Sequence, residues 1–144
     1  MRWMAGIVLA LWIAMGLLLT LQPVHPAPGQ VVSDNGIPFR TIAIYLANGE
    51  SPFWVRQFAG NLFLLLPVGL LGPMVVPALN GWLRLFTVAL AMSLAIEVAQ
   101  LWIPNRSADV DDVMLNVAGG MLGYAIFTLF RLGSRRPSPV ADGR

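Results

Sequence analysis

Four long apolar stretches, separated by segments rich in proline, glycine and charged residues, dominate the chain. Each stretch has about the length of a helix that crosses a membrane, roughly 20 residues. The pattern predicts an all-α membrane protein, a bundle of about four transmembrane helices at residues 4–21, 55–79, 83–103 and 113–130. Prolines within the second stretch predict that this helix is kinked, because helices in membranes tolerate proline at the cost of a bend.

A secretory signal peptide is the alternative for residues 4–21. The apolar run is longer than the usual signal core, and the small-x-small site that follows it, Ala27 to Gly29, is crowded by proline. We therefore favour an uncleaved membrane anchor.

The segments between the apolar stretches are short, with one exception. Residues 22–54 are predicted to form one long extracytoplasmic loop, because their prolines and glycines interrupt any continuous helix. Within it, residues 41–47 are too few to span, so we expect them to lie at the membrane interface or to pack on the bundle. Residues 104–112 form a polar loop and helix start, and residues 131–144 a cytoplasmic tail. Its polar part, residues 135–144, carries two prolines, and we expect it to be disordered.

The composition narrows the possible functions. A chain of 144 residues has room for one domain, and 57% hydrophobic against 11% charged residues fits a lipid environment. No cysteine is present, which excludes disulfides, thiolate metal sites and cysteine nucleophiles. The basic residues are scattered arginines, so nothing indicates nucleic-acid binding.

The arginines also predict an orientation. With four spans both termini share one side, which then holds six arginines, whereas the other side holds three: Arg40, Arg56 and Arg106. The positive-inside rule therefore places both termini in the cytoplasm of a multi-pass plasma-membrane protein.

Polar side chains form a stripe on each of the last two predicted helices. Ser93, Glu97 and Gln100 fall within about 60° of one another on the third helix. On the fourth, five residues fall within an arc of about 80°: Asp109, Asp112, Asn116, Gly119 and Gly123. The two glycines have no side chain on that face, so another helix can approach it closely.

Depth brings these stripes together. The second span starts, the third ends and the fourth starts on the same side of the membrane, with Asn61 and Glu97 each roughly 9 to 11 Å in from that side at about 1.5 Å per residue. We expect one polar layer near the outer face, made of Asn61, Glu97, Gln100, Asp112 and Asn116.

Each member of this layer also has a purely structural interpretation. Asp109 can be the N-cap of the fourth helix, followed by Asp111 and by Asp112 at the N3 position. Such carboxylates are typical of the start of a helix. Arg106 then pairs with these carboxylates in a solvated loop, and the amides and Ser93 serve as interhelical hydrogen-bond partners. Glu97 is the hardest to explain structurally, because an ionisable residue inside a span costs on the order of 3 kcal/mol.

These residues resemble the VanZ-like family of integral membrane proteins over roughly residues 37–124. The resemblance rests on residues 37–40 and on three ordered blocks: Asn61 with Pro67 and Gly69, then Ser93 with Glu97 and Gln100, then Arg106 with Asp109, Asp112, Asn116, Gly119 and Gly123. It implies a four-helix envelope protein, in a family named for an accessory determinant of teicoplanin resistance. It implies no settled chemistry.

Three functions remain open. The leading hypothesis is binding of an envelope lipid or lipid-linked precursor at the outer leaflet, with a link to teicoplanin tolerance. The second is an intramembrane enzyme, in which Glu97 or Asp112 acts as general base on a lipid-linked phosphate or ester and Arg106 stabilises the developing charge. The third is a structural scaffold for a membrane-protein partner.

The candidate residues follow from the leading hypothesis. Ligand binding is assigned to Asn61, Ser93, Glu97, Gln100, Arg106, Asp109, Asp112 and Asn116. Glu97 and Asp112 are also the candidates for catalysis and for sharing a divalent cation, because paired carboxylates suit both tasks.

Overall fold

The computed structural model describes residues 2–23, 34–47 and 52–134, without the side chains of residues 52–54. The polar tail beyond residue 134 lies outside this part of the chain. The elements are, in order, α1 (Arg2–Thr20), α2 (Arg40–Ala47), α3 (Pro52–Leu64), α4 (Leu66–Val75), the 3-10 turn η1 (Pro77–Leu79), α5 (Trp82–Gln100) and α6 (Val110–Gly133).

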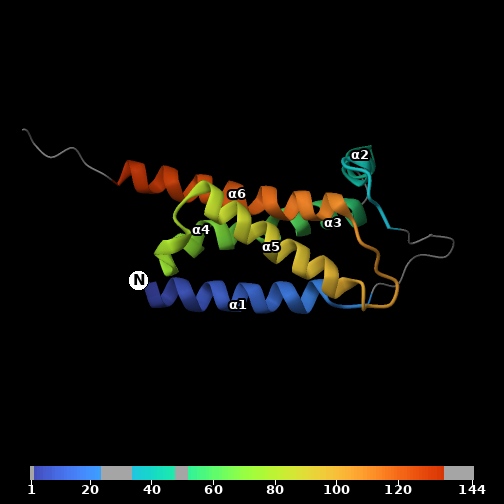
Figure 1. Ribbon diagram of the computed structural model, residues 1–144, viewed down its shortest axis with the longest axis horizontal. Coiled ribbons are helices and arrows are strands. Elements are labelled where there is room, and N and C mark those ends of the chain that lie inside the picture. Colours follow the sequence, from blue (N-terminus) through green and yellow to red (C-terminus); the bar gives the residue numbers. More distant parts are fainter. Residues whose placement is uncertain (1, 24–33, 48–51, 135–144) are drawn as a thin grey trace, which may run out of the picture.

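The described residues contain four helical stretches long and apolar enough to cross a membrane, which confirms the predicted all-α membrane fold. They are Arg2–Thr20, Val55–Val75, Trp82–Gln100 and Val110–Gly133. Figure 1 shows them side by side as an elongated bundle, with α1 and α6 on opposite flanks and α2 set apart at one end. The start of α1 and the end of α6 lie together at the other end.

The second span is broken where the prolines predict a bend. Helix α3 ends at Leu64 and α4 begins at Leu66, with a proline, Pro67, in its first turn. Proline cannot donate a backbone hydrogen bond and crowds the preceding turn, so the ladder is interrupted there. The two halves continue in one span, and together they pack along α6.

Glycines bring α6 into backbone contact with this broken span, as the sequence predicts. A Cβ atom at Gly119 would overlap the carbonyl oxygen of Leu62, and one at Gly123 that of Leu66. Across the same interface, a Cβ at Gly69 would overlap the carbonyl oxygen of Gly120. Such close approach is how helices gain packing energy where lipid removes the hydrophobic drive for association.

The connection between α5 and α6 differs from the predicted boundaries. Helix α5 ends at Gln100 instead of residue 103, because the residues ahead of Pro104 turn, and Asn105 adopts a left-handed conformation with φ 62°. Helix α6 begins at Val110, inside the segment 104–112 that is predicted to hold the helix start, because Asp109 is its N-cap and accepts the Asp111 N–H. It continues to Gly133, into the predicted tail.

The short helix α2 packs on the bundle, one of the two placements that the sequence allows. It contacts α3 and α6 at the end away from the N-terminus. Tyr45 is its buried residue, and its ring meets Phe58 of α3 edge-on at 6.2 Å.

Candidate functional site

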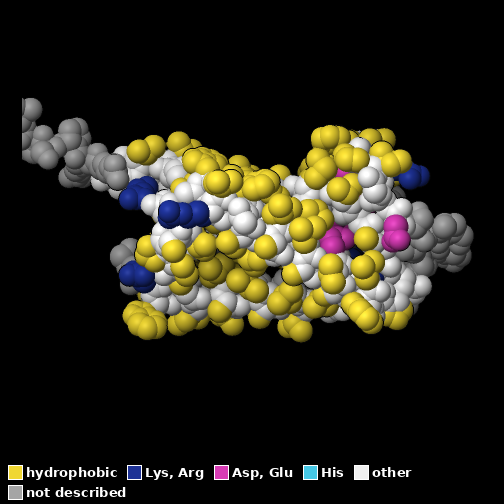
Figure 2. All heavy atoms as spheres, in the orientation of Figure 1, with side chains coloured by type: hydrophobic (Ala, Val, Ile, Leu, Met, Phe, Trp, Pro, Cys, Tyr) yellow, Lys and Arg dark blue, Asp and Glu magenta, His cyan; other side chains and the backbone are white. Residues whose placement is uncertain are grey.

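Charge is distributed unequally between the two ends of the bundle. Among the described residues, the end that holds the start of α1 carries Arg2, Arg84 and Arg131, whereas the carboxylates lie at the end beside α2 (Figure 2). We call the latter the polar end. A network of hydrogen bonds there, the polar cluster, joins Asn35, Thr41, Tyr45, Asn61, Glu97, Asp109, Asp111 and Asp112.

Asp111 holds the start of α2. Its side chain is fully buried, and its two carboxylate oxygens accept the backbone N–H groups of Phe39 at 2.6 Å, Thr41 at 2.7 Å and Ile42 at 3.1 Å. Helix N-termini leave such N–H groups without partners and carry partial positive charge, so a carboxylate is the natural acceptor. The same contact secures Phe39, whose φ of 67° is unusual for a residue other than glycine.

Asp109 links three chain segments. Its Oδ1 accepts from the Asn35 side-chain amide at 2.9 Å, and its Oδ2 accepts from the Thr41 hydroxyl at 2.6 Å. The backbone of Asn35 also pairs with residues 108–110. Its N–H donates to Ala108 O at 2.9 Å, and its carbonyl oxygen accepts from the Val110 N–H at 3.0 Å. The predicted N-cap therefore does more than start a helix, because it anchors residues 34–41 to the bundle.

Asp112 lies between α2 and α3. Its Oδ1 accepts from the Asn61 amide and, at 3.4 Å, from the Tyr45 hydroxyl. Burial raises the pKa of Tyr45, and nearby Asp112 raises it further, so the phenol stays protonated and able to donate. This pairing of Asn61 with Asp112 is one of the encounters that the depth argument predicts.

Four other predicted site residues, on α5 and α6, make three separate sets of contacts. Glu97 is buried, and its Oε2 accepts the Asp109 backbone N–H at 3.0 Å, so it braces the loop before α6. Gln100 donates to the Thr20 carbonyl oxygen at 3.1 Å and ties α5 to the end of α1. Asn116 donates to the Ser93 hydroxyl at 3.1 Å within the bundle, while its own Oδ1 is buried without a partner.

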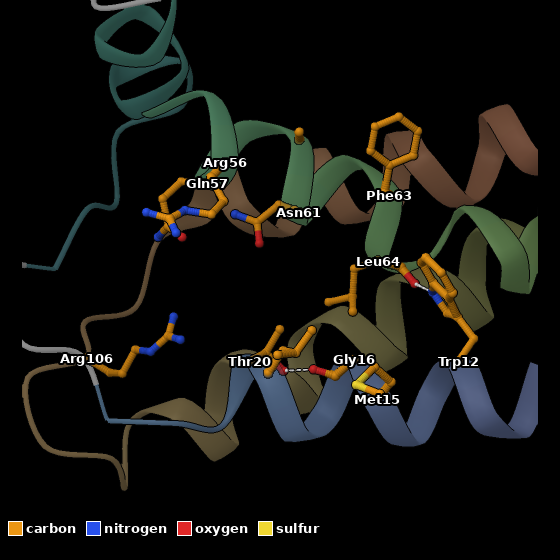
Figure 3. A pocket seen from close by; sticks show the side chains of 13 residues that line it. Trp12, Met15, Gly16, Thr20, Arg56, Gln57, Asn61, Phe63, Leu64 and Arg106 are labelled. Atoms are coloured by element: carbon orange, nitrogen blue, oxygen red, sulfur yellow. Dashed lines mark hydrogen bonds between the residues drawn. The ribbon is translucent and has the colours of Figure 1, made fainter. Parts of the chain in front are cut away.

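A cavity of about 580 Å³ lies between α1 and α3, next to the polar cluster. Apolar and small side chains make its wall: Trp12, Met15, Gly16, Leu19, Ala59, Gly60, Phe63 and Leu64. Polar side chains gather toward the polar end: Thr20, Arg56, Gln57, Asn61 and Arg106. Figure 3 shows Asn61 pointing into this space, with α1 and α3 on opposite sides.

Two arginines approach the cavity from different elements, Arg56 from α3 and Arg106 from the loop before α6 (Figure 3). Neither forms an ion pair with any carboxylate in the part of the chain that the structure describes. Arg106 is half-buried, and its Nε is buried without a hydrogen-bond partner. An unpaired buried donor is costly, so a site of this kind favours an anionic acceptor.

Several residues at this end were not among the predicted site residues. Arg56 could have been found from its position, since it lies at the start of the second span on the same side as Arg106. Asn35 and Thr41 carry no such signal, because their partners are about 70 residues away along the chain. Asp111 was interpreted only as part of helix initiation, and its contact with α2 is a long-range one.

A shared divalent cation between Glu97 and Asp112 stays a prediction. Within residues 2–23, 34–47 and 52–134, no group of three or more histidine or acidic side chains is arranged to hold a metal ion. Each of the two carboxylates accepts a hydrogen bond from the protein, as described above.

Comparison with known proteins gives one match. The protein-family model described as VanZ/LLP1 matches residues 5–131, from the first turn of α1 to the last turns of α6. No curated protein and no solved structure matches the chain.

Proposed function

The chain belongs to the VanZ/LLP1 family, and on this premise we propose that it binds the phosphate-bearing head group of an envelope lipid or lipid-linked precursor at the outer leaflet. The observation that supports this proposal is the pair of arginines at the α1–α3 cavity. Arginine offers planar, bidentate donation that matches phosphate oxygens, and neither side chain forms an ion pair with a described carboxylate.

The charge distribution supports the proposed orientation. By sequence, six arginines belong to the side of the termini and three to the polar end, so the positive-inside rule places both termini in the cytoplasm of the plasma membrane. The cavity then opens near the outer leaflet. A protein that holds a lipid-linked precursor there would change how much of that precursor an extracellular glycopeptide can bind. We therefore extend the proposal to teicoplanin tolerance.

The proposal assigns two tasks to the residues of the polar end and the cavity. Asp109, Asp111, Asp112 and Glu97 accept hydrogen bonds from the protein itself, which favours a structural task at the polar end. Arg56, Gln57, Asn61 and Arg106 line the cavity and are assigned to the ligand. Catalysis by Glu97 or Asp112 stays a prediction, as does a membrane-protein partner.

Native mass spectrometry of the protein in mild detergent tests the proposal. Wild type should retain a phosphate-bearing lipid. Retention should fall roughly tenfold in Arg56→Ala and in Arg106→Ala, because a charge-assisted hydrogen bond contributes about 1.5–3 kcal/mol. Arg40→Ala is the matched control, since Arg40 is exposed at the same end and does not line the cavity. Equal retention in all four proteins would contradict the proposal.

A further inference from the structure

We infer that the apolar part of the α1–α3 cavity is a binding site for a hydrocarbon chain, which a phosphate-bearing lipid inserts sideways from the bilayer. This inference rests on the proposed function for the position of the phosphate. It goes further in assigning the cavity wall to the chain, so that the ligand must be an amphiphile and not a soluble phosphate.

Depth is the first argument. Trp12 lies eight residues before the end of α1 at Thr20, and Phe63 lies eight residues after the start of the span at Val55. At about 1.5 Å per residue, both lie roughly 12 Å along their helices from the polar end. The hydrocarbon core of a bilayer is about 30 Å thick, so the cavity extends well into the depth of lipid chains.

The wall chemistry is the second argument. The cavity residues around Trp12 and Phe63 are apolar or small. Four of the apolar residues that line the cavity between the polar end and this depth are also partly exposed: Trp12, Met15, Leu19 and Phe63. Side chains that line the cavity and also reach the surface make an opening that faces lipid. A hydrocarbon chain can enter there without crossing the polar cluster.

The floor and the end of the cavity fit the same ligand. The Trp12 indole donates to the Leu64 carbonyl oxygen at 3.0 Å, which satisfies a backbone group near the break between α3 and α4 (Figure 3). The Thr20 hydroxyl donates to Gly16 O at 2.8 Å, so it too is satisfied within the protein. Arg56 and Arg106, the charged residues that line the cavity, form no ion pair with a described carboxylate, and they lie where the phosphate is expected.

Two glycines line the cavity in different surroundings. Gly16 is buried in the α1 wall, where a Cβ atom would come within 2.6 Å of a Leu64 methyl carbon, so α1 lies in close contact with Leu64 there. Gly60, in the α3 wall, has nothing within 4 Å of the position of a Cβ atom. A larger side chain at Gly60 can therefore be introduced without a clash, and it would take up room at the cavity.

The test uses alkyl phosphates, which carry the same head group on chains of different length. Binding of hexadecyl phosphate and of butyl phosphate is measured by native mass spectrometry on wild type, Gly60→Leu and Met15→Trp. The two substitutions place larger side chains on opposite walls and so reduce the space in the cavity. Gly133→Leu is the matched control, because its Cβ also meets nothing within 4 Å and lies at the far end of α6. All variants are required to remain monodisperse.

We expect wild type and Gly133→Leu to prefer hexadecyl phosphate at least tenfold, and this preference to fall several-fold in Gly60→Leu and Met15→Trp. An equal preference in all four proteins, or none in wild type, would overturn the chain site and leave the arginine site standing. Undiminished hexadecyl phosphate binding in the Arg56→Ala, Arg106→Ala double variant, with loss in Gly60→Leu, would instead support the chain site and overturn the proposed head-group function.

Discussion

Helices α6 and α1 are both long and apolar, yet they pack in opposite ways. In their most apolar 18-residue stretches, 39% of the α6 residues are buried against 6% of those in α1. Glycines and the carboxylates at its start hold α6 against its neighbours α2, α3 and α4, whereas α1 turns leucine, methionine and tryptophan side chains outward. Hydrophobicity therefore selects the membrane for both helices, while small and polar residues decide which of them is packed closely against its neighbours.

The largest effect is expected where α6 meets the backbone of α3. Gly119→Leu forces a side chain into the Leu62 carbonyl, so it should destabilise the bundle by at least about 3 kcal/mol or prevent folding. The apparent melting temperature in mild detergent measures this. Gly133→Leu is the control on the same helix, because its added side chain meets open space. A Gly119→Leu variant as stable as this control would remove the packing difference between α6 and α1.

The next largest effect concerns the polar start of α6. Asp111→Asn removes the charge and one of the two acceptor oxygens that hold the N-terminus of α2, at a cost of about 2 to 3 kcal/mol. Backbone amides of residues 39–42 should then exchange with deuterium much faster than in wild type.

Asp34→Asn is the control for this experiment, because the exposed Asp34 side chain accepts only the Ala108 N–H in this region. It should leave the exchange of residues 39–42 close to wild type. Equal acceleration in both variants would mean that α2 is held by general charge and not by Asp111.

The periodicity of the sequence and the depth of residues along the spans predicted more of the fold than of the candidate site. The apolar stretches indicate the membrane fold, and Gly119 and Gly123 indicate the close contact of α6, because both signals are local to one helix. The pairing of Asn61 with Asp112 follows from depth along known spans. The contact of Asp111 with α2 could not be predicted in this way, since it depends on how residues 34–42 fold back over the bundle. The cavity likewise depends on the separation of α1 from α3, to which no single residue points.

A smaller effect is expected inside the bundle. Ser93→Ala removes the acceptor of the Asn116 amide, whose Oδ1 is already unpaired, and should cost about 1 kcal/mol. The double variant Ser93→Ala, Asn116→Leu should recover part of this loss, because it removes the buried amide altogether. Thermal unfolding of the single and double variants measures both changes. A double variant less stable than the single one would show that the Asn116 side chain is needed for packing instead.

The smallest change in stability is expected at α1. Trp12→Phe keeps an aromatic ring at the cavity wall and removes only the indole donation to Leu64 O, which should cost about 0.6 kcal/mol. Its effect on the mobility of α1 should be easier to detect than its effect on the melting temperature, since the buried residue of this helix, Gly16, has no side chain to hold it in place. A spin label at Leu11, an exposed position on α1, should report greater mobility in Trp12→Phe than in wild type. A label at Leu122 of α6, which is also exposed, should report none, because α6 is held by its glycine contacts. Equal changes at both positions would mean that α1 is as firmly packed as α6.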